Sequence, residues 1–176
     1  MDTGTAGLEG DVAADVTAEL IAVLAARGLT VAVAESLTGG ELVAELTRPA
    51  GASAVVVGGV VVYATELKHS IVGVDRALLD AHGPVHADVA DQLARGVRTK
   101  LAVAGRPADI GLATTGVAGP AEQGGRPPGT VFVGLSVMER TRVVELALTG
   151  TRAEIRRQVV RRTIAELASD LGTGPI

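Results

Sequence analysis

The chain contains no cysteine and no tryptophan, and it has only one phenylalanine and one tyrosine among its 176 residues. The absence of cysteine excludes disulfide bonds, thiolate metal sites and a thiol nucleophile. The scarcity of aromatic side chains argues against a surface on which single-stranded bases stack. The net charge of −4 argues against general nucleic-acid binding, which relies on a basic face. We therefore expect no nucleic-acid partner.

The sequence also lacks the features of a membrane or secreted protein. No apolar run reaches the length that spans a bilayer, and residues 1–10 lack the basic and apolar regions of a signal peptide. We expect no membrane association and a cytoplasmic location. Residues 1–10 are small, polar and glycine-rich, which favours a flexible N-terminus, and residues 11–176 are expected to form one domain.

The three histidines do not form a metal-binding pattern. His82 and His86 are four residues apart, but Gly83 and Pro84 between them break the helix that would align the two rings. His69 is the remaining histidine, and no cysteine is available as a further ligand. The sequence therefore predicts neither a metal site nor another cofactor.

Hydrophobic residues make up 47% of the chain and follow the periods of helices and strands in turn. Helices that alternate with apolar strands, followed by a hairpin, indicate a single-domain, three-layer α/β/α sandwich with a mixed sheet. Residues 116–129 are crowded with glycine and proline and are expected to form a long functional loop. The expected helices are residues 11–27, a segment after Gly40, a short helix between Asp75 and Gly83, 87–101 and 152–171, and the expected strands are 31–34, 54–63, 110–113, 131–137 and 143–148.

One strand-to-helix turn has the features of an anion site. The apolar run 31–34 predicts a buried strand, and Thr38 with Glu41 has the spacing of a capping box, which makes Thr38 the expected N-cap. Gly39 and Gly40 would then lie in the first helical turn, where glycine lets a ligand approach free backbone amides. Such amides, at the positive end of a helix dipole, favour phosphate binding. The alternative is a turn in which the glycines only allow tight packing.

Several segments of the chain resemble, in the same order, those of the CinA C-terminal domain family, the nicotinamide-nucleotide amidases. The resemblance extends from about residue 11 to residue 171. The segments are ESLTGG (35–40), PAGAS (49–53), GGV (58–60) followed by Tyr63 and Lys68, TGVAGP (115–120), RPPGTV (126–131) and GTRAEIR (150–156).

The resemblance implies an amidohydrolase that deamidates nicotinamide mononucleotide to nicotinate mononucleotide and ammonia, a step of pyridine nucleotide salvage. It implies a small-molecule nucleotide as substrate and assembly as a homo-oligomer, with a dimer favoured. By motif position it implies a Ser–Lys dyad of Ser53 and Lys68. Ser36, Thr38 and Tyr63 also match positions that line the site of the family.

The residues themselves leave two serines as candidate nucleophiles. Neither Ser36 nor Ser53 lies in a G-x-S-x-G elbow, so no hydrolase triad is expected. A lysine can activate a serine without histidine if burial lowers the lysine pKa. We expect Ser53 as the nucleophile and Lys68 as the base, with Tyr63 positioning or relaying the proton. The strand 54–63 would bring them to one end of the sheet, and Ser36 remains the alternative nucleophile.

Ligand contacts are expected from two glycine-rich turns and one arginine. The backbone of the loop after the strand 110–113 would approach the ligand, as glycine loops do at α/β sites. Arg152, at a helix start, would supply a charge-assisted hydrogen bond to phosphate. The expected substrate-binding residues are Glu35, Thr38, Gly39, Gly40, Thr115, Gly116, Gly119, Pro120 and Arg152.

Some positions depart from the pattern of the family. They include Leu37, where the family often has cysteine, His86 in place of a serine, and the segment 121–125, which is usually richer in glycine. These changes bear on substrate preference more than on the fold. The alternative function is a catalytically silent nucleotide-binding module, and a third is a small α/β protein whose glycine turns are only structural.

Overall fold

The computed structural model of the protein describes residues 15–173. Its centre is a five-stranded sheet in the order β2-β1-β3-β4-β5, in which β1 pairs in parallel with β2 and β3 while β4 and β5 are antiparallel to their neighbours. The strands are β1 (Val31–Glu35), β2 (Val56–Val61), β3 (Ile110–Gly116), β4 (Thr130–Val137) and β5 (Arg140–Ala147). The expected flexible segment 1–10 lies outside the described residues.

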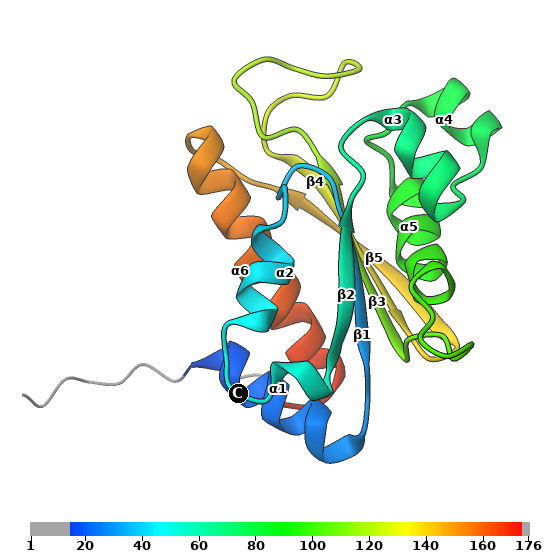
Figure 1. Ribbon diagram of the computed structural model, residues 1–176. Coiled ribbons are helices and arrows are strands. Elements are labelled where there is room, and N and C mark those ends of the chain that lie inside the picture. Colours follow the sequence, from blue (N-terminus) through cyan, green and yellow to red (C-terminus); the bar gives the residue numbers. More distant parts are fainter. Residues whose placement is uncertain (1–14, 174–176) are drawn as a thin grey trace, which may run out of the picture.

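Helices cover both faces of the sheet (Figure 1). Two clusters of buried apolar side chains fill the spaces between the sheet and its helices. The apolar side chains that recur every four residues from Val89 to Leu101 predict one buried helix face; Val89, Leu93 and Val97 are fully buried, and Leu101 is partly buried. The single-domain, three-layer α/β/α sandwich with a mixed sheet is therefore confirmed. One layer holds α1 (Val16–Arg27), α2 (Glu41–Thr47) and α6 (Arg152–Asp170), and the other holds α3 (Thr65–Leu67), α4 (Arg76–His82) and α5 (Ala87–Lys100).

Several helix ends follow the local chemistry of the sequence. α1 ends at Gly28, whose left-handed backbone, with φ +64°, fits glycine at a helix C-terminus. The Asp75 side chain caps α4, as expected. α6 starts with a complete capping box, in which the Thr151 side chain and the Glu154 carboxylate each accept the backbone N–H of the other residue.

The valine-rich segment 54–63, interrupted by Gly58 and Gly59, predicts a buried strand with a bulge or a close backbone approach. β2 instead lies at the edge of the sheet and its residues are partly buried or exposed, so the prediction of burial was wrong. The predicted irregularity is present, because the register slips where Val56 and Gly58 pair with consecutive residues of β1. A Cβ on Gly59 would lie 3.1 Å from the Val43 side chain. Glycine therefore allows α2 to pack closely on this edge strand.

The carboxyl ends of β1, β2 and β3 meet at one end of the sheet, because these strands run parallel. Ser36 follows β1, Lys68 lies shortly after β2, and the loop 117–129 follows β3. The fold therefore gathers three of the segments singled out in the sequence at the place where open α/β sheets bind ligands. Within residues 15–173, no helix is both long and apolar enough to cross a membrane.

Candidate active site

Lys68 is the centre of the candidate site, and only 1% of its surface is exposed. It begins a short π-helical segment, η2 (Lys68–Val72), directly after α3. Its Nζ atom lies 3.1 Å from the Ser36 hydroxyl oxygen and donates to the Val62 carbonyl at 2.7 Å. A longer contact of 3.4 Å joins it to the Tyr63 carbonyl. A buried amine therefore lies within hydrogen-bonding distance of a serine hydroxyl.

Burial lowers the pKa of Lys68 from its ordinary value of 10.5 to about 8. Among the described residues, the Nζ atom contacts one hydroxyl and two carbonyl oxygens but no carboxylate. No negative charge at Nζ therefore raises the Lys68 pKa again. Glu66, which is close in sequence, is exposed and forms an ion pair with Arg76 at 2.5 Å. With a pKa of about 8, Lys68 is neutral in roughly a tenth of the molecules at pH 7 and in about half of them near pH 8, and the lone pair of the neutral amine can accept a proton.

The structure does not bring Ser53 to Lys68, the two residues of the predicted dyad. Ser53 is exposed in the short segment η1 (Ala52–Ala54), which precedes β2, whereas Lys68 follows that strand. The six residues of β2 separate the two ends by roughly 20 Å, at about 3.3 Å per residue. Ser36, the alternative nucleophile, is the serine that contacts Lys68.

The turn that holds Ser36 is not built as the sequence suggested. The N-cap of α2 is Gly40, and no side chain caps the helix from that position. The Thr38 hydroxyl lies 2.8 Å from the Thr114 hydroxyl on β3, and both side chains are fully buried. The predicted capping box of Thr38 and Glu41 is therefore wrong, because the Thr38 side chain faces the sheet.

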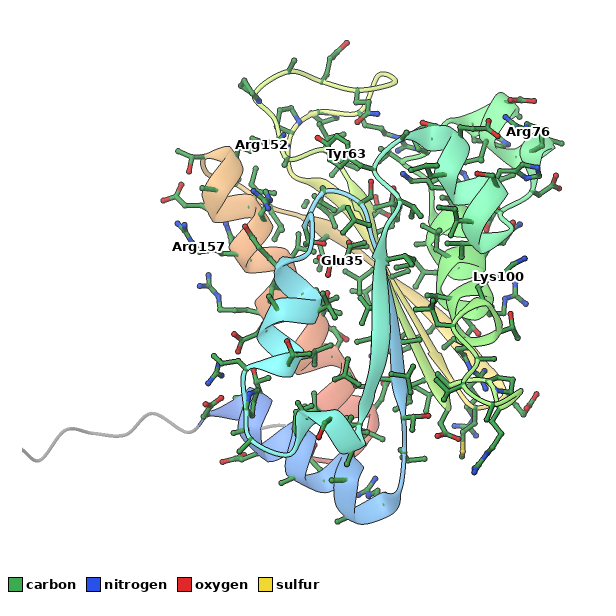
Figure 2. All side chains as sticks on the ribbon, viewed as in Figure 1. Glu35, Tyr63, Arg76, Lys100, Arg152 and Arg157 are labelled. Carbon is green, nitrogen blue, oxygen red and sulfur yellow. The ribbon has the colours of Figure 1, made fainter. Side chains whose placement is uncertain are left out.

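Glu35 satisfies the amides at the start of α2. Its carboxylate accepts the backbone N–H of Gly40 at 2.9 Å, of Leu42 at 3.1 Å and of Val43 at 2.8 Å. The Glu35 side chain is buried at the centre of the molecule (Figure 2). The Gly40 amide is thus occupied by Glu35, the Gly39 amide donates to the Ser36 carbonyl at 3.1 Å, and a carboxylate already lies at the positive end of the helix dipole. The physical basis for a phosphate site at this turn is lost.

Arg152 and Tyr63 meet at the mouth of the site, as Figure 2 shows. Arg152 donates to the Tyr63 hydroxyl at 3.1 Å and to the Gly119 carbonyl at 2.8 Å. These two bonds use two of the five guanidinium donors, which leaves others for an anion. Because 60% of the Tyr63 surface is exposed, its ring lies at the opening, while its carbonyl faces Lys68.

A cavity of about 330 Å³ contains both reactive groups. Its wall includes Ser36, Lys68, Tyr63 and Arg152, together with the expected loop residues Thr115, Gly116, Gly119 and Pro120. Glu35, Thr38, Gly39 and Gly40 are not among the residues that line it. The expected ligand contacts therefore divide into two groups: the end of β3, the loop after it and Arg152 face the cavity, whereas the other four residues belong to the turn around Ser36.

Sequence reasoning missed Thr114 and the segment of Pro84 and Val85. Pro84 and Val85 line the cavity, and the Thr115 hydroxyl donates to the Pro84 carbonyl at 2.6 Å. Thr114 is fully buried on β3, with its hydroxyl 3.4 Å from the Ser36 amide. The signal available in the sequence was a pair of hydroxyl residues at the end of an apolar strand.

The histidines have local structural contacts. The rings of His82 and His86 stack with centroids 4.7 Å apart, and the His86 ring nitrogen accepts the backbone N–H of Asp88 at the start of α5. His69 Nδ1 lies 2.7 Å from the Val74 carbonyl. Among residues 15–173, no three His, Asp or Glu side chains gather as metal ligands would.

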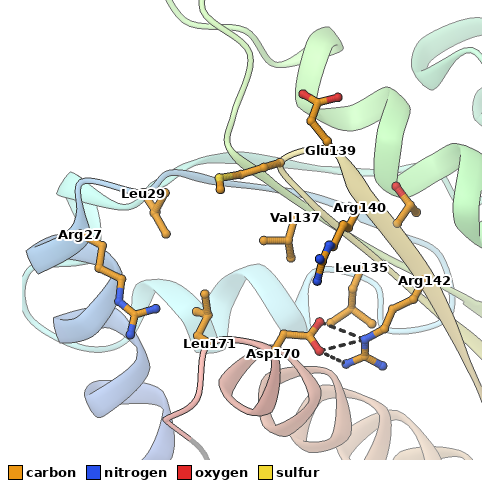
Figure 3. A pocket seen from close by; sticks show the side chains of 11 residues that line it. Arg27, Leu29, Leu135, Val137, Glu139, Arg140, Arg142, Asp170 and Leu171 are labelled. Atoms are coloured by element: carbon orange, nitrogen blue, oxygen red, sulfur yellow. Dashed lines mark hydrogen bonds and ion pairs between the residues drawn. The ribbon is translucent and has the colours of Figure 1, made fainter.

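A larger hollow, of about 1080 Å³, lies at the opposite end of the sheet (Figure 3). It adjoins the β4–β5 turn, where Val137 pairs with Ile110 at the start of β3. Arg142 in its wall is ion-paired with Asp170. It contains neither Ser36 nor Lys68, and the smaller cavity is therefore the candidate active site.

A family model for the CinA C-terminal domain matches residues 13–171. A CinA-like protein of Frankia casuarinae is 43% identical over 169 residues, which cover 92% of this chain and 38% of the relative. The chain thus spans well under half the length of curated relatives that it matches.

Solved structures of similar proteins have the same fold. The competence damage-inducible protein A of Klebsiella pneumoniae matches with a TM-score of 0.83 and 33% identity, over 90% of this chain and 96% of that one. A competence/damage inducible protein of Agrobacterium tumefaciens matches with a TM-score of 0.82 and 31% identity, over 88% and 93% of the two chains.

Proposed function

The chain belongs to the CinA C-terminal domain family, and from this premise we propose that it is an amidohydrolase converting nicotinamide mononucleotide and water to nicotinate mononucleotide and ammonia. The observation that carries the proposal is the contact of 3.1 Å between Lys68 Nζ and Ser36 Oγ in a cavity. The motif resemblance to nicotinamide-nucleotide amidases supports the choice of substrate. The proposal concerns this domain, which corresponds to 38% of the length of the Frankia relative, and not the rest of that longer protein.

In the first step, Ser36 attacks the carboxamide carbon of the substrate. Neutral Lys68 takes the proton from the Ser36 hydroxyl as the new C–O bond forms, which gives a tetrahedral intermediate with a negatively charged oxygen. The C–N bond then breaks, and Lys68 returns the proton to the leaving nitrogen. Ammonia departs, and the acyl group remains as an ester on Ser36.

In the second step, water hydrolyses that ester. Lys68 takes a proton from the attacking water, the bond between the acyl carbon and the Ser36 oxygen breaks, and the proton passes to the serine oxygen. The acid product and the free enzyme result. One lysine thus serves both half-reactions, because it is neutral at the start of each.

The phosphate of the substrate would bind to Arg152 at the mouth of the cavity. Arg152 is held by the Tyr63 hydroxyl and the Gly119 carbonyl, and its guanidinium has further donors. A charge-assisted contact at the opening, with the carboxamide end directed toward Ser36, would orient the substrate. Thr115 and Gly116 at the end of β3, with Pro120 in the loop that follows, would line the ring of the substrate.

Burial of Lys68 favours an enzyme over a catalytically silent binding module. An amine with 1% exposure and no carboxylate partner destabilises the fold whenever it is charged. A passive nucleotide site gains nothing from that arrangement, whereas a general base requires it. We further propose that the chain assembles as a homo-oligomer, with a dimer favoured, which light scattering of the purified protein would test.

The proposal is tested by incubating the purified protein with nicotinamide mononucleotide. We expect ammonia and nicotinate mononucleotide to form in equal amounts, with no need for an added metal ion. Ammonia is measured by a coupled enzyme assay and the nucleotide by chromatography. Nucleotide binding without ammonia release would favour the silent module.

A further inference from the structure

Arg156 differs from the neighbouring arginines of α6 because its side chain reaches the turn that carries Ser36. Arg156, Arg157, Arg161 and Arg162 lie outside the apolar stripe of this helix in the sequence, which predicts a solvated face. Arg157 conforms to this prediction, since it is exposed and points away from the molecule (Figure 2). The Arg156 side chain is only 27% exposed and contacts residues more than a hundred positions earlier in the chain.

One guanidinium holds two points of the turn. Arg156 Nη2 donates to the Thr38 carbonyl at 2.9 Å and pairs with the Glu41 carboxylate at 2.8 Å. Thr38 precedes α2 and Glu41 is the first residue of that helix, so Arg156 joins α6 to both sides of the helix start. Charge-assisted bonds of this kind are about twice as strong as neutral ones.

Gly39 provides the space for this contact. A Cβ at Gly39 would lie 3.2 Å from Arg156 Nη2, and the residue has φ +60°. A side chain would therefore be strained and would press on the guanidinium group. The glycine that the sequence suggested for phosphate is explained by the approach of an arginine.

We infer that Arg156 is a positioning residue for Ser36 in the proposed reaction. The turn from Ser36 to Gly40 is held by Glu35 at the amides of α2, by Thr114 at the Thr38 hydroxyl and by Arg156 at the Thr38 carbonyl. The first two anchors come from the sheet, and Arg156 is the anchor from the helical layer. Its loss frees the outer side of the turn, so that Ser36 Oγ departs from its place beside Lys68.

The kinetic test of this inference rests on the proposed function. It compares Arg156→Ala and Arg156→Lys with the control Arg157→Ala. We expect Arg156→Ala to lower kcat by on the order of 10²-fold, because small misplacements of a reacting group have effects of this size. KM should change little, since Arg156 does not line the cavity. Added guanidinium ion should restore part of the activity of Arg156→Ala, and Arg157→Ala should match the wild type.

Arg156→Lys keeps the charge but lacks the planar fork, so we expect an intermediate loss of kcat. It also carries the kinetic test if Arg156→Ala does not fold. A wild-type kcat in either folded Arg156 variant would overturn the inference.

Hydrogen exchange of residues 36–43 tests the clamp without any substrate. Faster exchange in Arg156→Ala or Arg156→Lys than in Arg157→Ala supports the inference, and unchanged exchange overturns it. If the wild-type protein releases no ammonia from nicotinamide mononucleotide, the proposed function fails while the exchange measurement still decides the role of Arg156.

Discussion

The Nζ atom of Lys68 lies 3.1 Å from Oγ of Ser36, although the two residues are 32 positions apart in the chain. β1 delivers Ser36 and the segment after β2 delivers Lys68 to the same end of the parallel part of the sheet. Burial of the lysine lowers its pKa to about 8, and a serine is within reach of its lone pair.

The proposed amidohydrolase activity should rise with pH. Only neutral Lys68 can accept the proton of Ser36, so kcat/KM should increase about tenfold per pH unit at low pH and level off above about 8. Initial rates of ammonia release between pH 6 and pH 9.5 measure the profile. A rate that is flat or falls over that range would show that deprotonation of Lys68 does not control the reaction.

The stability of the protein should depend on the titration of Lys68. Folding lowers the pKa of Lys68 from 10.5 to about 8, so the unfolded chain binds more protons between these values and the free energy of unfolding rises with pH across that window. We expect an increase on the order of 3 kcal/mol relative to Lys68→Met, which lacks this contribution. Urea unfolding at several pH values measures it.

Lys100→Met is the matched control for the stability measurement, because Lys100 is exposed at the end of α5. Its pH dependence should match that of the wild type. If Lys68→Met also follows the wild-type curve from pH 8 to pH 10.5, burial does not shift the Lys68 pKa as described.

The turn at Ser36 should depend on Glu35 for its stability. Glu35→Gln replaces one acceptor oxygen by a donor group that faces backbone N–H groups, so we expect a loss of about 1–2 kcal/mol. Thermal unfolding measures the loss, and Glu145→Gln, on the exposed side of β5, should have little effect. Equal stability of the two variants would contradict the role given to Glu35.

Gly40→Val tests the same turn through its backbone. Gly40 has φ +101°, a conformation that a β-branched residue adopts only with strain of roughly 1–3 kcal/mol. The variant should therefore lose stability, and any weaker nucleotide binding should follow from the distorted turn. If the variant is as stable as the wild type but no longer binds the nucleotide, the result would contradict this explanation and support the phosphate site predicted from the sequence.

Two similar sequence patterns show which features of the structure local sequence predicts and which it does not. Thr38 with Glu41 and Thr151 with Glu154 have the same spacing, yet only the second pair forms a capping box. The difference comes from tertiary structure. The Glu35 side chain at the end of β1 accepts the backbone N–H groups at the start of α2, so the Thr38 side chain does not cap them. Local pattern predicted the strands and the longer helices but not α3 or η2, and it could not rank competing partners for one helix end.

The dyad was misassigned for a related reason. Motif position placed Ser53 with Lys68, but Ser53 precedes β2 and Lys68 follows it. Nothing local marks Lys68 as buried, since lysine is among the residues most often exposed. The contact with Ser36 requires the parallel pairing of β1 and β2, which brings together residues that the sequence keeps apart.

The central claim is that Ser36, and not Ser53, is the nucleophile that Lys68 activates. The most direct test measures ammonia release from nicotinamide mononucleotide by the wild type, Ser36→Ala, Ser53→Ala and Lys68→Met at pH 8.5. We predict that Ser53→Ala matches the wild type, whereas Ser36→Ala and Lys68→Met lose at least on the order of 10³-fold in kcat. Near-normal turnover by Ser36→Ala, or loss of turnover in Ser53→Ala alone, would contradict the claim.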